Sequence, residues 1–167
     1  MYQTGDQVVY GIHGVCRVVD IEKQIVNKKT EVYLVLEPVL QDGSRYLVPT
    51  SCEAAMSKLK PVLTKAELES LLRSDFVRSI HWISDENQRK YTYRELISSG
   101  NREELMRMVH TLYVHKTDRD TAGKKVHLAD DNFLRDAEKL LAGETAVVMN
   151  ISLDEARAYL REQLKKP

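Results

Sequence analysis

The first sixty residues alternate short apolar and polar runs in the way that β-strands do. β-Branched and aromatic residues gather in runs separated by glycine, asparagine and proline, which is typical of strands joined by tight turns. The runs that predict strands are residues 7–10, 14–26, 31–37 and 46–48. Residues 26–30 predict a hairpin loop, Asp42-Gly43 predicts a turn, and Pro49 marks a strand end or a sheet edge. Four or five such strands predict a small curled sheet or barrel.

After Pro61 the apolar positions recur at helical spacing instead. Capping-box patterns open two helices, one at Thr64 with Glu67 and one at Ser152 with Glu155. Asn101 is placed to cap a third. Five helices are predicted. One starts at Thr64, one covers residues 87–98, one starts at Asn101, and the last two cover residues 129–142 and 152–164. Residues 117–125 are polar and predict a loop, and Gly143 is expected to interrupt or end the fourth helix.

Together these patterns predict an α+β chain of two domains. A small β domain is expected over residues 1–55, a hinge over 56–63, and a bundle of about five helices over 64–167. The length of 167 residues suits one domain or two small ones.

Composition narrows the function classes that remain. The chain carries 25 Lys and Arg against 25 Asp and Glu, and the two signs also balance within residues 1–60 and within residues 61–167. Strong nonspecific binding of nucleic acid through net charge is therefore not expected, although a local basic patch is compatible with this balance.

The cellular location is inferred by elimination. Cys16 and Cys52 form neither a disulfide framework nor a metal-binding spacing, which favours reduced thiols in a cytoplasmic protein. The N-terminus lacks a basic stretch followed by an apolar run, and no apolar run approaches the roughly 18 residues of a membrane span. We therefore expect a cytoplasmic protein with no membrane partner.

The sequence carries no recognisable motif for catalysis or metal binding. His110 and His115 are five residues apart, which does not align two ligands on one helical face, and neither HExxH nor CxxC occurs. The Gly11–Gly14 segment lacks the ending of a phosphate-binding loop, so its glycines are better explained by a corner between strands. No GxSxG occurs either. We predict a protein that is not an enzyme and uses no metal or cofactor.

The segment Tyr46–Pro49 is the first candidate for binding. A short strand that ends at a proline is often an edge strand, and a partner can extend a sheet at such an edge. Periodicity alone favours the simpler alternative, in which these residues close a small barrel.

Trp82, the only tryptophan, is the second candidate. It precedes a basic segment that contains Arg89, Lys90 and Arg94. The pattern alone favours an ordinary core indole with a satisfied N–H. The functional alternative is an apolar wedge that stacks against bases while nearby cations hold phosphates.

Motifs in both halves together point to one known family. In the first half they are Gly5-Asp6, Val8-Val9-Tyr10, His13-Gly14-Val15, Tyr33–Leu36 and Val48-Pro49; in the second half they are Trp82, Arg89-x-Tyr91, Glu95-Leu96, Ser99-Gly100, Leu112-Tyr113 and Ala137–Glu144. Over nearly the whole chain this set resembles the CarD/CdnL family of bacterial transcription regulators. The first half of the pattern is shared with transcription-repair coupling factors, so the helical half supplies the distinction.

The resemblance implies a role for each half. It implies that a Tudor-like β barrel binds the RNA polymerase β subunit through its edge strand, with the contact at Gln24, Val26, Tyr46, Leu47, Val48 and Pro49. It implies that the helical domain touches promoter DNA at the upstream edge of the melted bubble, weakly and without sequence specificity, through Trp82, Arg89, Lys90, Arg94, Lys124 and Lys125. The tryptophan would act as a minor-groove wedge that stabilises the open promoter complex. We expect a monomer that reaches the nucleoid through polymerase.

Some positions depart from the family pattern. Gln24 and Leu47 fall where relatives often carry basic residues on the polymerase-facing surface. Asp130 and Asp131 stand where relatives often carry basic residues that touch DNA, which predicts a weaker DNA contact or one arranged differently. An alternative function therefore stays open, that of an adaptor which binds polymerase or another partner and never touches DNA.

Overall fold

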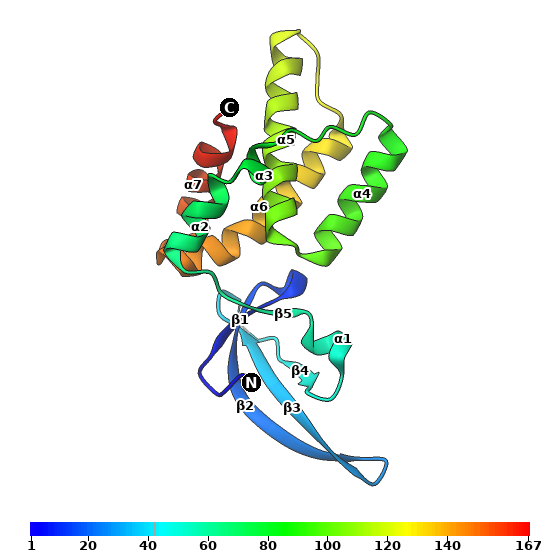
Figure 1. Cartoon of the computed structure of the whole chain (residues 1–167), viewed down its shortest axis with the longest axis vertical. Coiled ribbons are helices and arrows are strands. Elements are labelled where there is room, and N and C mark those ends of the chain that lie inside the picture. The colour runs from blue at the N-terminus through cyan, green and yellow to red at the C-terminus, as the bar shows by residue number, and fades with distance from the viewer. Residues whose placement is uncertain (42) are drawn as a thin grey trace. The chain divides into compact units, whose positions relative to one another are not determined.

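The computed structural model describes residues 1–41 and 43–167, and it divides into two compact units (Figure 1). The first unit spans Met1–Val62 and the second Leu63–Pro167. An antiparallel sheet makes up most of the first, and six helices make up the second within the described residues. The predicted α+β class in two parts is confirmed.

The first unit is a five-stranded antiparallel sheet with the strand order β4-β3-β2-β1-β5. Its elements are β1 (Gln7–Tyr10), β2 (Val15–Val26), β3 (Lys29–Pro38), β4 (Tyr46–Pro49), the short helix α1 (Glu53–Met56) and β5 (Leu59–Pro61). A single turn of 3₁₀ helix, η1 (Gly11–His13), joins β1 to β2. β4 and β5 are the two edge strands of the sheet.

The hinge predicted at residues 56–63 needs correction, because most of it belongs to the sheet. β5 pairs with β1 from Val8↔Pro61 to Tyr10↔Leu59, and the Leu59 side chain is buried in the core of the first unit. The pairing continues the sheet past residue 55, so the division between the units falls after Val62. Sequence pattern missed β5 because three residues are too few for a period to show.

Turn residues behave as their chemistry dictates. Asn27 and Lys28 both adopt positive φ, at 50° and 66°, as the tightest hairpin turn requires, and they join β2 to β3 in the predicted loop. Gly11 and Gly14 have positive φ at the corner between β1 and β2, as expected. Asp42 of the predicted Asp42-Gly43 turn lies outside the described residues.

The main core cluster of the first unit lies on one face of the sheet, while Val15 and Val35 are buried on the other face. Its buried members are Val8, Cys16, Val18, Leu34, Leu36, Val48 and Leu59. They alternate along each strand with residues of the opposite face, as the two-residue period of a pleated strand requires. Burial raises the pKa of the Cys16 thiol to about 11, so this thiol is neutral at physiological pH.

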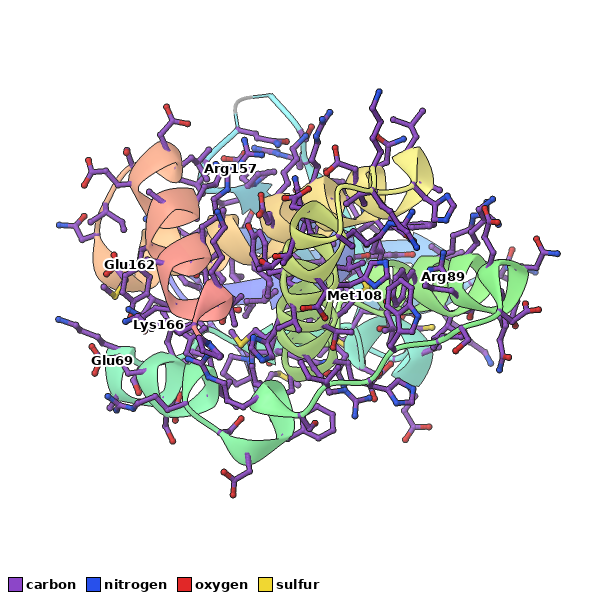
Figure 2. All side chains as sticks on the ribbon, turned by 90° about the horizontal axis from the view of Figure 1, so that it is seen from above. Glu69, Arg89, Met108, Arg157, Glu162 and Lys166 are labelled. Carbon is purple, nitrogen blue, oxygen red and sulfur yellow. The ribbon has the colours of Figure 1, made fainter. Side chains whose placement is uncertain are left out.

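The second unit is a helical bundle built around one central helix. Its helices are α2 (Lys65–Leu72), α3 (Asp75–Arg78), α4 (Glu86–Ser99), α5 (Arg102–Thr121), α6 (Leu128–Met149) and α7 (Leu153–Lys165). Figures 1 and 2 show α5 with α4 on one side and α7 on the other; the labelled Met108 of α5 lies between Arg89 of α4 and Lys166 beyond α7. α5 accordingly carries a run of buried residues from Leu105 to Tyr113.

The predicted helix caps are confirmed in detail. Thr64 and Glu67 form a reciprocal capping box, and the side chains of Asn101 and Ser152 accept hydrogen bonds from the N–H groups three residues on. Each such bond satisfies one of the free N–H groups of a first helical turn. Caps depend only on neighbours in the chain, which is why sequence located them well.

Two predicted boundaries in the bundle are wrong. Residues 117–121, predicted as part of a loop, continue α5 to Thr121. Gly143, expected to interrupt or end a helix, lies inside α6, which ends only at Asn150 in the left-handed conformation. Glu144, Thr145 and Ala146 are buried directly after the glycine. Their burial offsets the cost of about 1 kcal/mol that a glycine imposes on a helix.

Among the described residues, no helix combines the length and the apolar character that crossing a membrane requires.

Candidate functional site

The edge strand β4 is the candidate site of the first unit. It pairs with β3 from Leu36↔Tyr46 to Tyr33↔Pro49, and within the described residues no strand pairs with its other edge. Its Leu47 side chain is 46% exposed, whereas Val48 is fully buried. The strand therefore offers one free backbone edge and one apolar side chain to a partner.

The six residues that the resemblance assigned to polymerase contact divide between the two faces of the sheet. Residues paired across strands share a face, and neighbours along a strand alternate. The register places Gln24, Val26, Leu47 and Pro49 on the face opposite the core. Tyr46 and Val48 lie on the core face instead. Val48 is thus corrected as a contact residue: its side chain packs inside, and only its backbone can meet a partner.

Tyr46 belongs to an aromatic cluster at the start of β4. Its ring lies 4.4 Å from that of His13 and 5.7 Å from that of Tyr10, centroid to centroid. The rings of Tyr10 and His13 are 5.1 Å apart. Such ring contacts help to hold β4, which pairs with a single strand, in the sheet. His13, quoted above as part of a family motif, thus packs against the edge strand.

The hairpin of β2 and β3 extends beyond the other strands. β1 pairs with β2 only at Val15–Arg17, so the later part of β2 has β3 as its only sheet neighbour among the described residues. Ile25 on this part is 81% exposed, and Val26 beside it is 42% exposed. Ile25 is an exposed apolar residue that the sequence analysis did not single out. The residues around Ile25 alternate between apolar and polar, a pattern that predicts a strand with one buried face and therefore a buried Ile25.

Trp82 is the candidate site of the second unit, on a segment without regular secondary structure between α3 and α4. Hydrogen bonds hold the backbone on both sides of it. The N–H of His81 donates to the Thr111 Oγ1 at 3.2 Å, and Arg89 Nη1 donates to the carbonyl of Ile83 at 3.0 Å. The segment is irregular in shape and nevertheless fixed to α5 and α4.

The indole ring itself contacts two further side chains. It stacks on His115 of α5 with 3.6 Å between ring centroids and 14° between planes. The guanidinium carbon of Arg89 lies 4.5 Å from the ring centroid, within the range of a cation–π interaction. Trp82 is partly buried and packs against the core of the bundle. The side chain of Trp82 is therefore neither fully buried, as a core indole would be, nor freely exposed, as a simple wedge would be.

Arg89 is the second correction to the predicted contact residues. It is only 3% exposed, and its Nε and Nη2 donate to Asp130 Oδ1 and Oδ2 at 2.8 and 3.1 Å. A phosphate cannot reach a guanidinium that is enclosed and already bonded in this way. Sequence placed Arg89 in a basic segment, but the helical turn points it inward while Lys90 and Arg94 point outward.

The other predicted DNA-contact residues are accessible. Arg94, Lys124 and Lys125 are exposed, and Lys90 is partly exposed and pairs with Glu86 at 2.9 Å. Arg119 shapes the turn after α5, because its Nε donates to the carbonyl of Lys125 at 2.8 Å.

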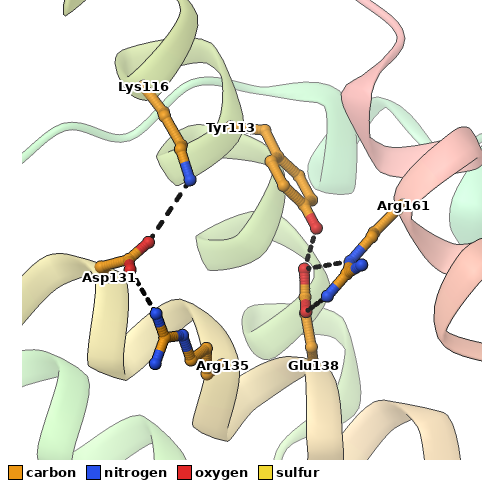
Figure 3. Close-up of polar contacts among 6 residues, drawn as sticks. All are labelled: Tyr113, Lys116, Asp131, Arg135, Glu138 and Arg161. Atoms are coloured by element: carbon orange, nitrogen blue, oxygen red, sulfur yellow. Dashed lines mark hydrogen bonds and ion pairs between the residues drawn. The ribbon is translucent and has the colours of Figure 1, made fainter. Parts of the chain in front are cut away.

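The acidic start of α6 is compensated inside the unit. Asp130 is paired with Arg89 as described above. Asp131 contacts Lys116 at 3.4 Å and Arg135 at 3.0 Å (Figure 3). Carboxylates in a first helical turn also interact favourably with the helix dipole. The two acidic residues therefore present less uncompensated negative charge than the sequence implied.

A second polar cluster ties three helices together. Glu138 of α6 is buried and accepts hydrogen bonds from the Tyr113 hydroxyl and from the Arg161 guanidinium of α7 (Figure 3). Its contacts are all within the bundle, so we assign it to the fold and not to binding.

Two titratable groups near Trp82 are perturbed. Burial lowers the pKa of His115; the cations Arg119 and Arg89 lower it further, and the carboxylates Asp130 and Asp118 oppose them. Burial, with the nearby Asp130 carboxylate, raises the pKa of Tyr93 to about 12. His115 is therefore neutral at pH 7 and stacks on the indole as an uncharged ring.

Three residues that contact Trp82 or hold its surroundings were missed in this role by sequence reasoning. They are His115, which stacks on the indole, Thr111, which binds His81, and Asp130, which binds Arg89. Thr111 and His115 are four residues apart on α5 and so share one face of that helix. That spacing was a usable signal for a shared face, but nothing in the sequence ties that face to Trp82. Across residues 1–41 and 43–167, no group of three or more His, Cys, Asp or Glu side chains is placed to hold a metal ion.

Comparison with known families gave one match. Residues 2–60 match the model of the family described as the CarD-like/TRCF RID domain. The match covers β1 to β4 and reaches into β5, and the helical unit lies outside it. No curated protein matches the chain.

Proposed function

Because residues 2–60 match the model of the CarD-like/TRCF RID domain, an RNA polymerase β-interacting module, we propose that this chain is a transcription regulator with two contacts. The first unit binds the polymerase β subunit through the β4 edge. The helical unit stabilises the open promoter complex through Trp82 and nearby basic residues. The family match of the first unit is the observation that carries the proposal.

The geometry of the first unit supports docking at β4. An unpaired strand edge allows a partner strand to add main-chain hydrogen bonds, and side chains on one face then supply specificity. Leu47 and Pro49 lie on the face opposite the core, together with Gln24 and Val26 of the hairpin. The same register places the charged side chains of Glu22, Glu31 and Lys29 on this face as well, so charge would contribute to the contact beside shape and backbone pairing.

A weak DNA contact by the helical unit suits the neutral charge of the chain. Polymerase binding raises the local concentration of promoter DNA, so the helical unit needs little affinity of its own. Lys90, Arg94, Lys124 and Lys125 are accessible to phosphates. An apolar wedge costs little at a base step that melting has already unstacked, so it favours the open form selectively.

Polymerase binding is tested with the full chain and a fragment of the polymerase β subunit. Leu47→Asp puts a charge on the docking face and should weaken binding at least about tenfold, since each 1.4 kcal/mol is tenfold in affinity. Lys58→Asp is the control, because Lys58 is exposed in the turn before β5. Equal binding by both variants would contradict docking at β4.

The DNA contact is tested by the lifetime of the open promoter complex. Trp82→Ala should shorten it while leaving polymerase binding intact. Phe76→Ala is the matched control, because Phe76 is an exposed aromatic residue on α3 of the same unit.

The alternative function is an adaptor that binds polymerase or another partner without touching DNA. One observation favours it: Trp82 packs against the bundle core and stacks on His115, as a structural indole does. An unchanged open-complex lifetime with a folded Trp82→Ala variant would select this alternative.

A further inference from the structure

The ion pair of Arg89 and Asp130 is almost completely enclosed in the helical unit. The two side chains are 3% and 1% exposed, and two hydrogen bonds join them across α4 and α6. Burying such a pair costs so much desolvation that apolar residues of similar volume often stabilise a fold equally well or better. Stability alone therefore gives a weak reason for these two charges.

The contacts of Arg89 point to another reason. Its Nε and Nη2 bind Asp130, its Nη1 binds the carbonyl of Ile83 at 3.0 Å, and its guanidinium lies by the Trp82 ring. Asp130 thus fixes the plane of the guanidinium, and the guanidinium fixes both the backbone beside Trp82 and the indole. A bidentate pair of planar groups restricts orientation in a way that a point charge does not.

The contacts from α5 complete the arrangement. Thr111 accepts a hydrogen bond from the N–H of His81, and His115 stacks on the indole. Arg89 and Thr111 thus hold the residues on either side of Trp82, and Arg89 and His115 hold its ring. A side chain that is ordered before binding does not lose that freedom on binding, which raises affinity without a new contact.

We propose that Arg89 and Asp130 are positioning residues that hold the Trp82 ring in one orientation in the free protein. For its functional meaning the inference rests on the proposed DNA contact of Trp82. It also changes the role of two residues. Arg89 acts by positioning the tryptophan and does not bind a phosphate. Asp130 helps to position the tryptophan, although an acidic residue at this place in the sequence suggests repulsion of DNA phosphates.

The first test uses the free full-length protein and the signals of its single tryptophan. The double variant Arg89→Met/Asp130→Leu replaces the pair with apolar side chains of similar size, which is expected to preserve the fold. We expect loss of the near-UV circular dichroism band of the indole and a new fast component in its fluorescence anisotropy decay. Unchanged indole signals in this variant would overturn the inference.

Two further variants sharpen this test. Asp131→Asn is the matched control, because the neighbouring carboxylate faces Lys116 and Arg135 and should leave the indole signals unchanged. Arg89→Lys keeps the charge opposite Asp130 but loses the planar fork, so it carries the test if the double variant does not fold. Indole signals like those of the parent protein in Arg89→Lys would count against positioning by the guanidinium plane.

The second test adds polymerase and promoter DNA and separates this inference from the proposed function. If both hold, the double variant shortens the open-complex lifetime, and adding Trp82→Ala to it has no further effect. If Trp82→Ala leaves the lifetime unchanged while the double variant alters the indole signals, the DNA contact is refuted and the positioning inference is supported. A third outcome would overturn action through Trp82. In it, the double variant shortens the lifetime, and adding Trp82→Ala shortens it again by the same factor as Trp82→Ala does in the parent protein.

Discussion

The rings of Trp82 and His115 lie stacked, with 3.6 Å between their centroids and 14° between their planes. The two residues come from different elements, the segment before α4 and the middle of α5. Because Trp82 is the only tryptophan, the indole fluorescence of the protein comes from this one residue. The stack therefore allows the protonation of His115 to be followed directly.

We predict that acidification quenches Trp82 fluorescence with a midpoint below the ordinary histidine pKa of about 6.5. Burial lowers the pKa of His115, so the ring stays neutral at pH 7 and gains its proton only at lower pH. A protonated imidazole quenches an excited indole more strongly than a neutral one. The measurement is a fluorescence titration of the folded protein. His115→Gln should remove the step, and a midpoint at or above the ordinary value would contradict the prediction.

The same pKa shift predicts how His115 contributes to stability. The unfolded state takes up a proton near the ordinary pKa, whereas the folded state resists protonation until the pH is lower. The contribution of His115 is therefore constant above pH of about 6.5 and declines as the pH falls through the lowered pKa. Urea unfolding of the protein and of His115→Gln should show a difference in free energy that changes only below that pH.

Tyr93→Phe is predicted to stabilise the helical unit by about 1 kcal/mol, because it removes a polar atom that gains nothing from burial. The Tyr93 hydroxyl is buried without a hydrogen-bond partner among the described residues. Urea unfolding followed by Trp82 fluorescence measures the change. Tyr91→Phe is the control, since Tyr91 is 65% exposed and its hydroxyl can reach water. Destabilisation by Tyr93→Phe would show that the hydroxyl is satisfied after all.

Gly143 and Gly100 should respond to alanine in opposite directions. Gly143 lies inside α6 with space for a Cβ atom, so Gly143→Ala should stabilise the helical unit by about 0.5–1 kcal/mol. Gly100 ends α4 with φ of 65°, so Gly100→Ala should destabilise it by about 1–2 kcal/mol. Thermal unfolding of both variants provides the comparison, and shifts of the same sign would contradict it.

Glu144→Ala is predicted to destabilise the helical unit by about 3 kcal/mol, since it removes a largely buried carboxylate that binds both Arg102 and the backbone of Leu63. Glu144 accepts two hydrogen bonds from Arg102 and one from the N–H of Leu63, the first residue of the unit. Urea unfolding followed by Trp82 fluorescence measures the loss. Glu86→Ala is the control, because its pair with Lys90 is exposed and should matter far less.

Much of the secondary structure was predictable because its determinants are local. The capping residues Thr64, Asn101 and Ser152 act on groups within three positions of themselves, and sequence located all three. The elements that were missed or misplaced depend on distant partners. β5 exists because β1 lies beside it, and α6 passes Gly143 because the residues that follow are buried against the bundle.

The candidate sites divide in the same way. Sequence alone determined the two-part α+β plan, the strand that ends at Pro49 and the presence of a single tryptophan, Trp82. These features depend on turn residues, periodicity and composition, which can be read without knowing which residues meet in space. Only the tertiary structure decided that Val48 and Arg89 face inward and that Asp130 and His115 act around Trp82. His115 and Asp130 lie 33 and 48 positions from Trp82 in the sequence. Such neighbours meet only when helices pack, and the burial that brings them together decides which charges remain available to a partner.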